Sequence, residues 1–518
     1  MATPSEQGTV SRLWRIAGRS LRGLWSTEGS VGQKAVRGAF WTVTNEWISS
    51  GLGFVQTVVL VRLLVPADFG IMRIAAFLLA LVLTFTKTGM DAAIIQRQDA
   101  ARKTIDTAWT INLLRSGLLY AVVFFAAPYV ARFYDNPIIS PILRVVGLKL
   151  LFAGFTNIGL ALLKKDLDFR VHELFFAATH ALGVAVTLVG AFILHSVWAI
   201  AIGQVAAAAI RMLGSYVVHA YRPRPVFDWA ETKRLLGFGL NLTGSGILIF
   251  LSTQGDDALV GKVVGMTWLG YYTLAYGLSI LPLKTITRVL SSVSFPAFSK
   301  LQGDLRRLTS AFSRVQMVVS ALVLPASVGL LLVAPDLVRV VYGQSYMPMV
   351  PCFQVLVIYG MVRAIAAANG PVFLATGNPR TALGVQAVRF VVLAATIYPM
   401  TVRWGISGAA GATTLSISAC TLWSFMRLRG VLGAGVLRRW AGHLGRLVLP
   451  LAAMSAVVVF LGEAPVGAAG RLVLKVVSGA LVYLVVLAAV FPELRGEARA
   501  VLRAAGAAPA PSGKEAGP

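Results

Sequence analysis

The sequence predicts an all-α polytopic membrane protein with about 14 transmembrane helices, arranged as two pseudo-symmetric six-helix lobes and a C-terminal helix pair. Composition, an internal repeat and the placement of charge predict this fold. Of the 518 residues, 57% are hydrophobic and 13% are charged, and the mean hydropathy is +0.75. Soluble domains carry about 25% charged residues. This chain therefore has more apolar surface than a water-soluble core can bury.

An internal repeat relates two halves of the chain. The stretch LVRLLVPADFGIMRIA at Leu60–Ala75 and the stretch VGKVVGMTWLGYYTLA at Val260–Ala275 share one pattern of apolar, basic and glycine positions. They are 200 residues apart, and Gly70 aligns with Gly270. Each stretch leaves one apolar run, turns, and enters the next. A repeat of this kind indicates two homologous lobes, and paired lobes around a central site are a recurring transporter plan.

Apolar runs mark the individual spans. A membrane-spanning helix needs roughly 20 apolar residues, and the runs between polar or turn-forming breaks supply about fourteen. The first half gives the runs 37–63, 68–90, 106–131, 138–163, 171–194 and 196–219. The second half gives 238–262, 267–292, 308–333, 348–374, 380–402 and 406–427, followed by 443–462 and 470–491. The breaks at His195 and Gly405 are the shortest, so they are the weakest divisions.

The polar breaks predict the domain organisation. The expected units are a cytoplasmic basic segment (1–34), an N-lobe with helices 1–6 (35–220), a cytoplasmic linker (221–237), a C-lobe with helices 7–12 (238–427), a second linker with helices 13–14 (428–491), and a disordered cytoplasmic tail (492–518). In the first segment, one helical face collects Arg12, Arg15, Arg19 and Arg22. Such a face suits a helix lying on anionic membrane lipids, and a disordered basic tail is the alternative.

Charge placement predicts the orientation. If the N-terminus is cytoplasmic and the number of spans is even, the inner loops collect cationic clusters such as Arg222, Arg224, Lys233 and Arg234. The outer loops then hold only scattered cations. Membrane proteins concentrate Lys and Arg in cytoplasmic loops. The pattern accounts for the net charge of +26 without nucleic acid, and it predicts cytoplasmic N- and C-termini.

No motif predicts catalysis, a cofactor or a metal site. Cys352 and Cys420 stand alone inside apolar runs, without disulfide or metal-ligand spacing. The phosphate-binding pattern G-x-x-x-x-G-K-[ST] is absent from the sequence, and the loops are too short to hold a nucleotide-binding domain. The sequence therefore predicts a protein that is not an enzyme.

Ionisable residues deep inside the runs are the candidate cavity residues. Glu46, Arg115, Lys149, Arg363 and Arg389 lie about nine to fifteen residues into their spans, which is near mid-membrane at about 1.5 Å per residue. A charge at this depth costs roughly 2.5–3.5 kcal/mol on insertion scales, so it usually faces a polar cavity. The alternative is that some of these cations pair with Glu46 or with backbone carbonyls and only hold helices together.

The first helix of each half carries a polar face. Residues at three- and four-residue steps share one side of a helix, and in 37–63 they include Asn45, Glu46 and Gln56. In 238–262 the corresponding residues are Asn241, Ser245 and Asp256. Under the 200-residue offset, Asn45 aligns with Ser245. Matching polar faces predict that both helices line one cavity, whereas interhelical hydrogen bonding is the alternative.

Three charged residues that bear on function lie nearer the ends of their spans. The adjacent carboxylates Asp256 and Asp257 predict a site that binds Na⁺ or H⁺ and couples transport to an ion gradient. A solvated loop position is the alternative for this pair. Arg73 lies close enough to a span end for its side chain to snorkel to the membrane interface or to anchor a loop, and these interpretations are favoured over a functional one.

Several stretches resemble a known transporter family. PADFGIMRIAAF, followed by GMDAAIIQRQD, resembles the first hairpin of bacterial polysaccharide exporters of the MOP superfamily. LGYYTLAYGLSILPL and VSFPAFSKLQGD resemble the eighth helix and the loop after it in the same family. The resemblance covers roughly residues 35–430 and is to the Wzx-type or colanic-acid-type flippases.

The resemblance implies two lobes that form a V around a central cavity and work by alternating access. It implies transport of undecaprenyl-pyrophosphate-linked oligosaccharide repeat units to the outer face, for lipopolysaccharide, exopolysaccharide or capsule biosynthesis. Deep Arg and Lys residues suit such an anion. Besides this lipid-linked substrate, a polysaccharide polymerase and glycosyltransferases are expected partners, and nucleic acid is not.

Three alternatives remain at this stage. A lipid II flippase of the same superfamily shares the helix count and the cationic cavity. A MATE-type drug/cation antiporter shares the fold, but a cation-rich midplane argues against cationic substrates. A membrane enzyme such as a polysaccharide polymerase is disfavoured because the loops are short.

Overall fold

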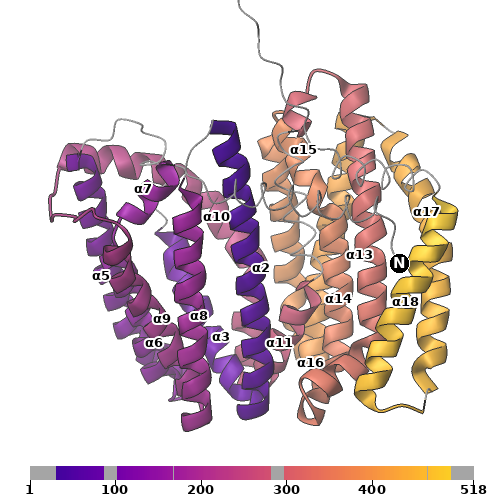
Figure 1. Ribbon diagram of the computed structural model, residues 1–518, viewed down its shortest axis with the longest axis horizontal. Helices are drawn as coiled ribbons and strands as arrows, with labels where there is room; N and C mark the ends of the chain where they lie inside the picture. Colours follow the sequence, from indigo (N-terminus) through magenta and orange to yellow (C-terminus); the bar gives the residue numbers. More distant parts are fainter. Residues whose placement is uncertain are drawn as a thin grey trace, which may run out of the picture.

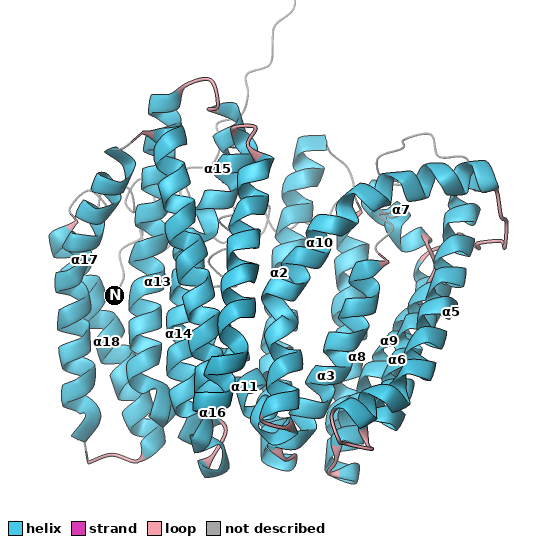
Figure 2. Ribbon diagram, turned by 180° about the vertical axis from the view of Figure 1, so that it is seen from behind, coloured by secondary structure: helices cyan, strands magenta, loops and turns pink. Residues whose placement is uncertain are grey.

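The computed structural model describes residues 31–86, 102–166, 168–281, 297–433, 435–463 and 465–491. Every regular element within these ranges is a helix (Figure 2). The predictions for residues 1–30 and for the tail 492–518 lie outside the described residues. The first described helix begins at Val31, several residues before the apolar run that predicted it.

The helices of the first half are α2 (Val31–Leu63), α3 (Pro66–Phe85), α5 (Arg102–Phe133), α6 (Ile139–Phe155), α7 (Gly159–Lys165), α8 (Phe169–Leu194) and α9 (Val197–Val218). Those that follow are α10 (Trp229–Val263), α11 (Met266–Ser279), α13 (Leu305–Val341), α14 (Val350–Ile365), α15 (Asn369–Ala375), α16 (Pro379–Leu432), α17 (Gly435–Phe460) and α18 (Ala468–Val490). Short 3₁₀ turns cover Gln344–Met349, Ala366–Ala368 and Leu461–Glu463.

Nine of the described helices are long and apolar enough to cross a membrane, or ten if the bent pair α6 and α7 forms one span with an angle of 59°. This is fewer than the fourteen predicted, and two physical reasons are visible. The helices α2 and α10 carry polar faces and fall outside the nine. α16 is continuous only in its hydrogen bonding, because Trp404 and Gly405 leave the helical conformation.

Both of the weakest predicted divisions are real breaks in the helical path. Gly405 has φ 57° and ψ −139°, which ends one apolar helix before the next begins. His195 adopts the left-handed conformation with φ 45° between α8 and α9. A non-glycine residue with positive φ is uncommon. His195 therefore marks a tight turn of the chain between α8 and α9, and hydrophobic periodicity alone does not locate such a turn well.

The helices stand in two groups that meet at one end. Figure 1 shows α2 to α9 on one side and α13 to α18 on the other. Two helices connect these groups: α10 packs against α3 and α16, and α11 packs against α3 and α14. The hydrophobic core runs through this junction, where Ile74 and Ala75 of α3 and Leu269 and Ala275 of α11 are fully buried.

Two glycines bring α3 and α11 into backbone contact. A Cβ atom on Gly70 would lie 2.0 Å from the carbonyl oxygen of Met266, and one on Gly270 would lie 1.8 Å from that of Pro66. Positions 66 and 266, like 70 and 270, correspond under the 200-residue repeat. The same contact is thus made twice, as across a two-fold axis. We call this the α3–α11 junction, and it lies at the lower end of the molecule in Figure 1.

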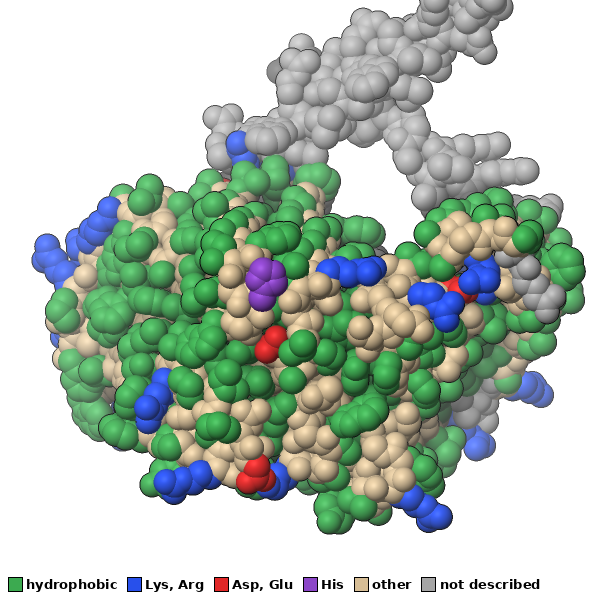
Figure 3. Space-filling view, turned by 90° about the horizontal axis from the view of Figure 1, so that it is seen from below, with side chains coloured by type: hydrophobic (Ala, Val, Ile, Leu, Met, Phe, Trp, Pro, Cys, Tyr) green, Lys and Arg blue, Asp and Glu red, His purple; other side chains and the backbone are tan. Residues whose placement is uncertain are grey.

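At the same end of the molecule, polar side chains of each half contact the other half. The Arg62 guanidinium donates to the carbonyl oxygen of Val340 at 2.5 Å, and the Lys262 ammonium pairs with Asp135 at 2.8 Å. Arg62 and Lys262 are aligned in the repeat, and each contacts the opposite half. Seen from below in Figure 3, charged side chains at this end are few and scattered among apolar and neutral ones.

Gly270→Ala is expected to lower the thermal unfolding temperature of the purified protein, because the added methyl group has no room against Pro66. Overpacking of this kind costs about 1–3 kcal/mol. Gly277→Ala on the same helix is the matched control, since a Cβ there meets no atom within 4 Å. Equal unfolding temperatures for the two variants would contradict the close contact.

The segment between α9 and α10 is fastened to the first half. The buried Asp106 carboxylate accepts hydrogen bonds from the Tyr221 hydroxyl at 2.6 Å and from the Arg224 backbone N–H at 3.0 Å. Lys103 pairs with Asp228 at 2.6 Å. Burial and the bond to Asp106 raise the pKa of Tyr221, so its hydroxyl stays protonated and continues to donate. These contacts therefore fix the segment to α5.

Candidate functional site

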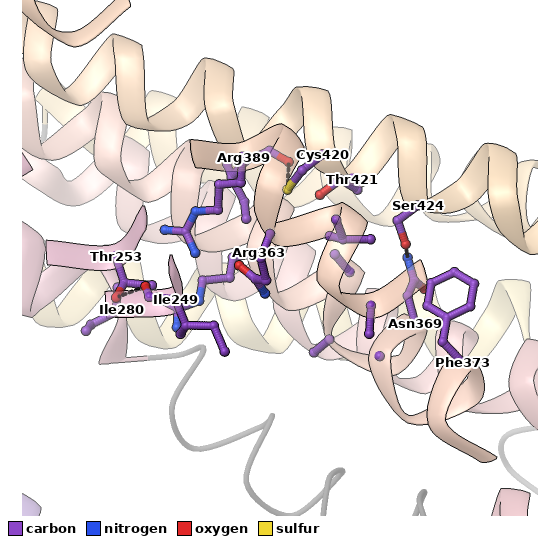
Figure 4. A pocket seen from close by; sticks show the side chains of 17 residues that line it. Ile249, Thr253, Ile280, Arg363, Asn369, Phe373, Arg389, Cys420, Thr421 and Ser424 are labelled. Carbon is purple, nitrogen blue, oxygen red and sulfur yellow. Dashed lines mark hydrogen bonds between the residues drawn. The ribbon is translucent and has the colours of Figure 1, made fainter. Parts of the chain in front are cut away.

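A pocket of about 430 Å³ that contains two arginines lies in the second half, between α10, α14, α15 and α16. Arg363 and Arg389 lie close together on its wall, and Asn369 and Ser424 lie further along it (Figure 4). None of the described residues that line the pocket is acidic. Its volume falls in the range of about 300–1,000 Å³ that is usual for small-molecule sites.

The two arginines converge on one tyrosine. Arg363 and Tyr359 are one turn apart on α14, so they share a face. The Tyr359 hydroxyl accepts hydrogen bonds from Arg363 and from Arg389 of α16, each at 3.0 Å. Arg363 also donates to Tyr276 of α11 at 3.3 Å. Neutral hydroxyls thus orient both guanidinium groups without neutralising them.

This arrangement concentrates positive charge where water is scarce. Arg389 is only 5% exposed, and its Nε–H has no hydrogen-bond partner among the described residues. Guanidinium groups are not deprotonated in proteins, and an uncompensated buried charge is costly. Arg363 and Arg389, which we call the arginine pair, therefore suit an anionic ligand with several acceptor oxygens.

Tyrosines connect the arginine pair to a buried pair of acids. The Tyr272 and Tyr276 rings lie 6.3 Å apart on α11, and the Tyr272 hydroxyl donates to Asp256 at 2.6 Å. Asp256 and Asp257 are 4% and 2% exposed, so the alternative of a solvated loop position is wrong. Asp257 pairs with Arg73 of α3 at 2.6 Å. The expected snorkelling of Arg73 is therefore also wrong, since it joins the first half to α10.

The other deep cations lie in the first half. Lys149 of α6 donates to the Gln204 side chain of α9 at 2.6 Å. Arg211 of α9 stacks 4.8 Å over the Phe176 ring. Neither Lys149 nor Arg115 of α5 lines the described pocket. The structure thus brings Arg363 and Arg389 together and places Lys149 and Arg115 elsewhere.

The polar face of α2 makes interhelical hydrogen bonds. The Asn45 amide donates to Glu173 of α8 at 2.6 Å and accepts from Ser49 at 3.2 Å. Glu173 is 8% exposed and also contacts the neighbouring His172 at 3.2 Å. For Asn45 the structure thus shows the contact that the interhelical alternative described. Sequence reasoning missed Glu173 because it lies 128 residues from Asn45.

The remaining predicted cavity residues do not belong to this pocket. Glu46 and Gln56 are partly buried on α2 and do not line it. The side chains of Asn241 and Ser245 lie in a section of α10 whose side chains are outside the described part of the structure.

Sequence reasoning missed the neutral members of the pocket. Asn369, Gln386 and Thr421 line it together with the arginine pair. One signal was available, because Gln386 precedes Arg389 by three residues and so shares its helix face. Neutral polar residues cost little at such depths compared with charges, so their presence alone does not identify a site.

The described ranges show how the metal-ligating residue types are grouped and what state the two cysteines are in. They hold no group of three or more His, Cys, Asp or Glu residues placed to bind a metal ion. Cys352 and Cys420 are buried and unpaired, in keeping with their interpretation as small core residues.

Comparisons with known proteins place the chain among polysaccharide exporters. A family model described as "Polysaccharide biosynthesis protein" matches residues 59–351, more than half of the chain. The lipopolysaccharide biosynthesis protein WzxC of Escherichia coli (strain K12) is 25% identical over 408 residues, covering 78% of this chain and 83% of WzxC. The teichuronic acid biosynthesis protein TuaB of Bacillus subtilis (strain 168) is 24% identical over 351 residues, covering 67% and 73%.

Solved structures show the same fold. The lipid II flippase MurJ in an inward closed conformation superposes with a TM-score of 0.71 at 14% identity, covering 88% of this chain and 99% of that one. An inward-facing MATE multidrug transporter gives a TM-score of 0.58 at 15% identity, covering 74% and 96%. The chain is thus a multi-pass membrane transporter rather than an enzyme, and it belongs to the Wzx-like polysaccharide exporter family of the MOP superfamily.

Proposed function

We propose that this protein is a flippase that moves undecaprenyl-pyrophosphate-linked oligosaccharide repeat units from the cytoplasmic to the outer face by alternating access. The arginine pair, in a pocket whose described lining holds no acidic residue, carries this proposal. A pyrophosphate presents several acceptor oxygens, which guanidinium groups bind with bidentate, charge-assisted hydrogen bonds. The names of the relatives, which refer to lipopolysaccharide and teichuronic acid, favour a surface glycan as the cargo.

The same proposal includes fourteen spans in two lobes. Counting α2 and α10 as polar spans, α11 as the start of another and α16 as two gives six in 35–220, six in 238–427 and the final pair α17 and α18. An even number keeps both termini cytoplasmic. The cation-poor end at the α3–α11 junction would then face outward.

Two related functions share the fold. A lipid II flippase would also need an anion site, but the glycan pathways in the relatives' names favour an oligosaccharide carrier. A MATE-type antiporter commonly takes cations, and the arginine pair repels them. The arginine pair therefore favours the lipid-linked anion over a cationic drug.

Depletion of the protein tests the proposal. Lipid-linked oligosaccharide should accumulate on the cytoplasmic face, where a membrane-impermeant oxidant or lectin reaches it only in inverted vesicles. Re-expression of the wild-type chain should restore export. Accumulation of lipid II instead, or a change in drug sensitivity alone, would contradict the proposal.

We further propose that Asp256 carries the coupling ion. Its Oδ2 accepts from Tyr272, while its buried Oδ1 has no partner among the described residues. An intramembrane carboxylate with a free acceptor can take up H⁺ or Na⁺. Asp257 is already paired with Arg73, so Asp256 is the better candidate of the two.

Asp256→Asn is expected to slow export to the rate seen without an ion gradient, at normal protein level, because the amide holds no exchangeable charge. Inverted vesicles with an imposed pH or Na⁺ gradient provide the measurement. Asp166→Asn, at an exposed site after α7, is the control. Unchanged export rate and ion dependence in the Asp256 variant would refute the assignment.

A further inference from the structure

The pocket that holds the arginine pair has two chemically different ends. At one end the guanidinium groups of Arg363 and Arg389 converge, and beyond them the lining is uncharged, with polar side chains set among apolar ones such as Phe373 (Figure 4). The neutral end, which we define by Asn369, Gln386 and Thr421, is contributed by α15 and α16. A ligand that fills the whole pocket must match both ends.

The neutral end presents acceptors that lack donors. Asn369 is 2% exposed; its amide N–H donates to the Ser424 hydroxyl at 3.0 Å, whereas its Oδ1 has no partner within the described ranges. The Oε1 atom of Gln386 is also buried without a partner among the described residues. Buried acceptors without donors destabilise a site until a ligand satisfies them. A ligand that supplies O–H or N–H groups at this end would do so.

The arginine end has the opposite requirement. The Nε–H of Arg389 is a buried donor that no described residue accepts from, so this end needs oxygen atoms that carry negative charge. A bare pyrophosphate would satisfy the arginines and leave the amide acceptors unmet. A sugar joined to a phosphate supplies acceptor oxygens at one side and hydroxyl donors at the other, and a pocket of about 430 Å³ is large enough for such a group.

We propose that the neutral end binds the first sugar of the transported unit, the one joined directly to the pyrophosphate. Asn369 and Gln386 accept hydrogen bonds from its hydroxyl or acetamido groups, and the Thr421 hydroxyl contacts the same sugar. These three residues then determine which first sugar is accepted, since a site built to pair with a hydroxyl rejects an analogue that lacks it. The proposal rests on the proposed function and adds its recognition element.

Binding to the purified full-length protein in nanodiscs tests the proposal with three probes: citronellyl pyrophosphate, and the same lipid carrying glucose or N-acetylglucosamine. At least one glycosylated probe should bind more tightly than the bare pyrophosphate. Gln386→Met and Thr421→Val should each weaken that glycosylated probe by about 3- to 10-fold, the usual effect of one lost hydrogen bond. Both variants should leave binding of the bare pyrophosphate unchanged.

Matched controls separate local from general effects. Gln354→Met and Thr413→Val replace the same residue types on α14 and α16 outside the pocket lining, and should change neither affinity. Arg389→Gln should weaken all probes, which tests the anion site alone. Unfolding temperatures show whether each variant is folded.

The outcomes distinguish the two proposals. If the bare pyrophosphate binds and neither sugar improves its affinity, or if Gln386→Met and Thr421→Val weaken all probes equally, the sugar assignment is wrong and the anion site stands. If none of the probes binds the wild-type protein, the proposed function fails as well.

Discussion

Arg389→Ala is expected to reduce export by about 10- to 100-fold, because each charge-assisted hydrogen bond to a ligand contributes about 1.5–3 kcal/mol. Arg363→Ala should have a similar effect, since both guanidinium groups point into the same pocket. Export is measured as the appearance of lipid-linked oligosaccharide at the outer face in cells that express equal amounts of each variant.

Arg403→Ala is the matched control for this prediction. Arg403 lies on the same helix as Arg389 but is exposed and stacks over the neighbouring Trp404 ring at 5.2 Å. Its loss should leave export unchanged. Full activity in Arg363→Ala and Arg389→Ala, and also in Arg115→Ala and Lys149→Ala, would show that intramembrane cations do not bind the substrate.

Arg73→Met is expected to destabilise the protein by about 3 kcal/mol, because it leaves the Asp257 carboxylate buried and unpaired. Asp257 is 2% exposed, so water cannot replace the lost partner. The value sits at the lower end for buried pairs because the Arg73 side chain retains 26% exposure. Thermal or denaturant unfolding in detergent measures the change.

The double variant Arg73→Met/Asp257→Leu supplies the internal control. Replacing both members of a buried ion pair with apolar groups is often neutral, so the double variant should recover most of the lost stability. An Arg73→Met protein as stable as the wild type would show that the pair does not hold α3 to α10. A double variant less stable than either single variant would likewise show that the pair does not hold α3 to α10.

The repeat predicted more of the fold than local periodicity did. Aligning Gly70 with Gly270 set the register of the two halves, and the structure shows that α3 and α11 touch at these two equivalent positions. Hydropathy was less informative for α2 and α10, whose polar faces lower the apolar signal. The break at Gly405 was recoverable because glycine alone adopts its backbone conformation easily.

The site was predicted in part. Depth within a span identified Arg363 and Arg389, and burial cost explains why such residues gather at a cavity. Depth could not show that Lys149 lies apart from the arginine pair, in the first half. Which deep cations share a pocket depends on how helices that are distant in sequence pack together. Arg73 was misjudged for the same reason: its partner Asp257 lies 184 residues away, and only packing reveals that Arg73 points inward.

The paired contact at the α3–α11 junction has an evolutionary consequence. Gly70 meets the backbone of residue 266 and Gly270 meets that of residue 66, so one surface recognises a copy of itself. A self-complementary surface needs only one coding sequence to form a symmetric dimer. A half-length ancestor with a single copy of this helix would already have possessed the interface that now joins the two halves, and gene fusion then left each copy free to diverge.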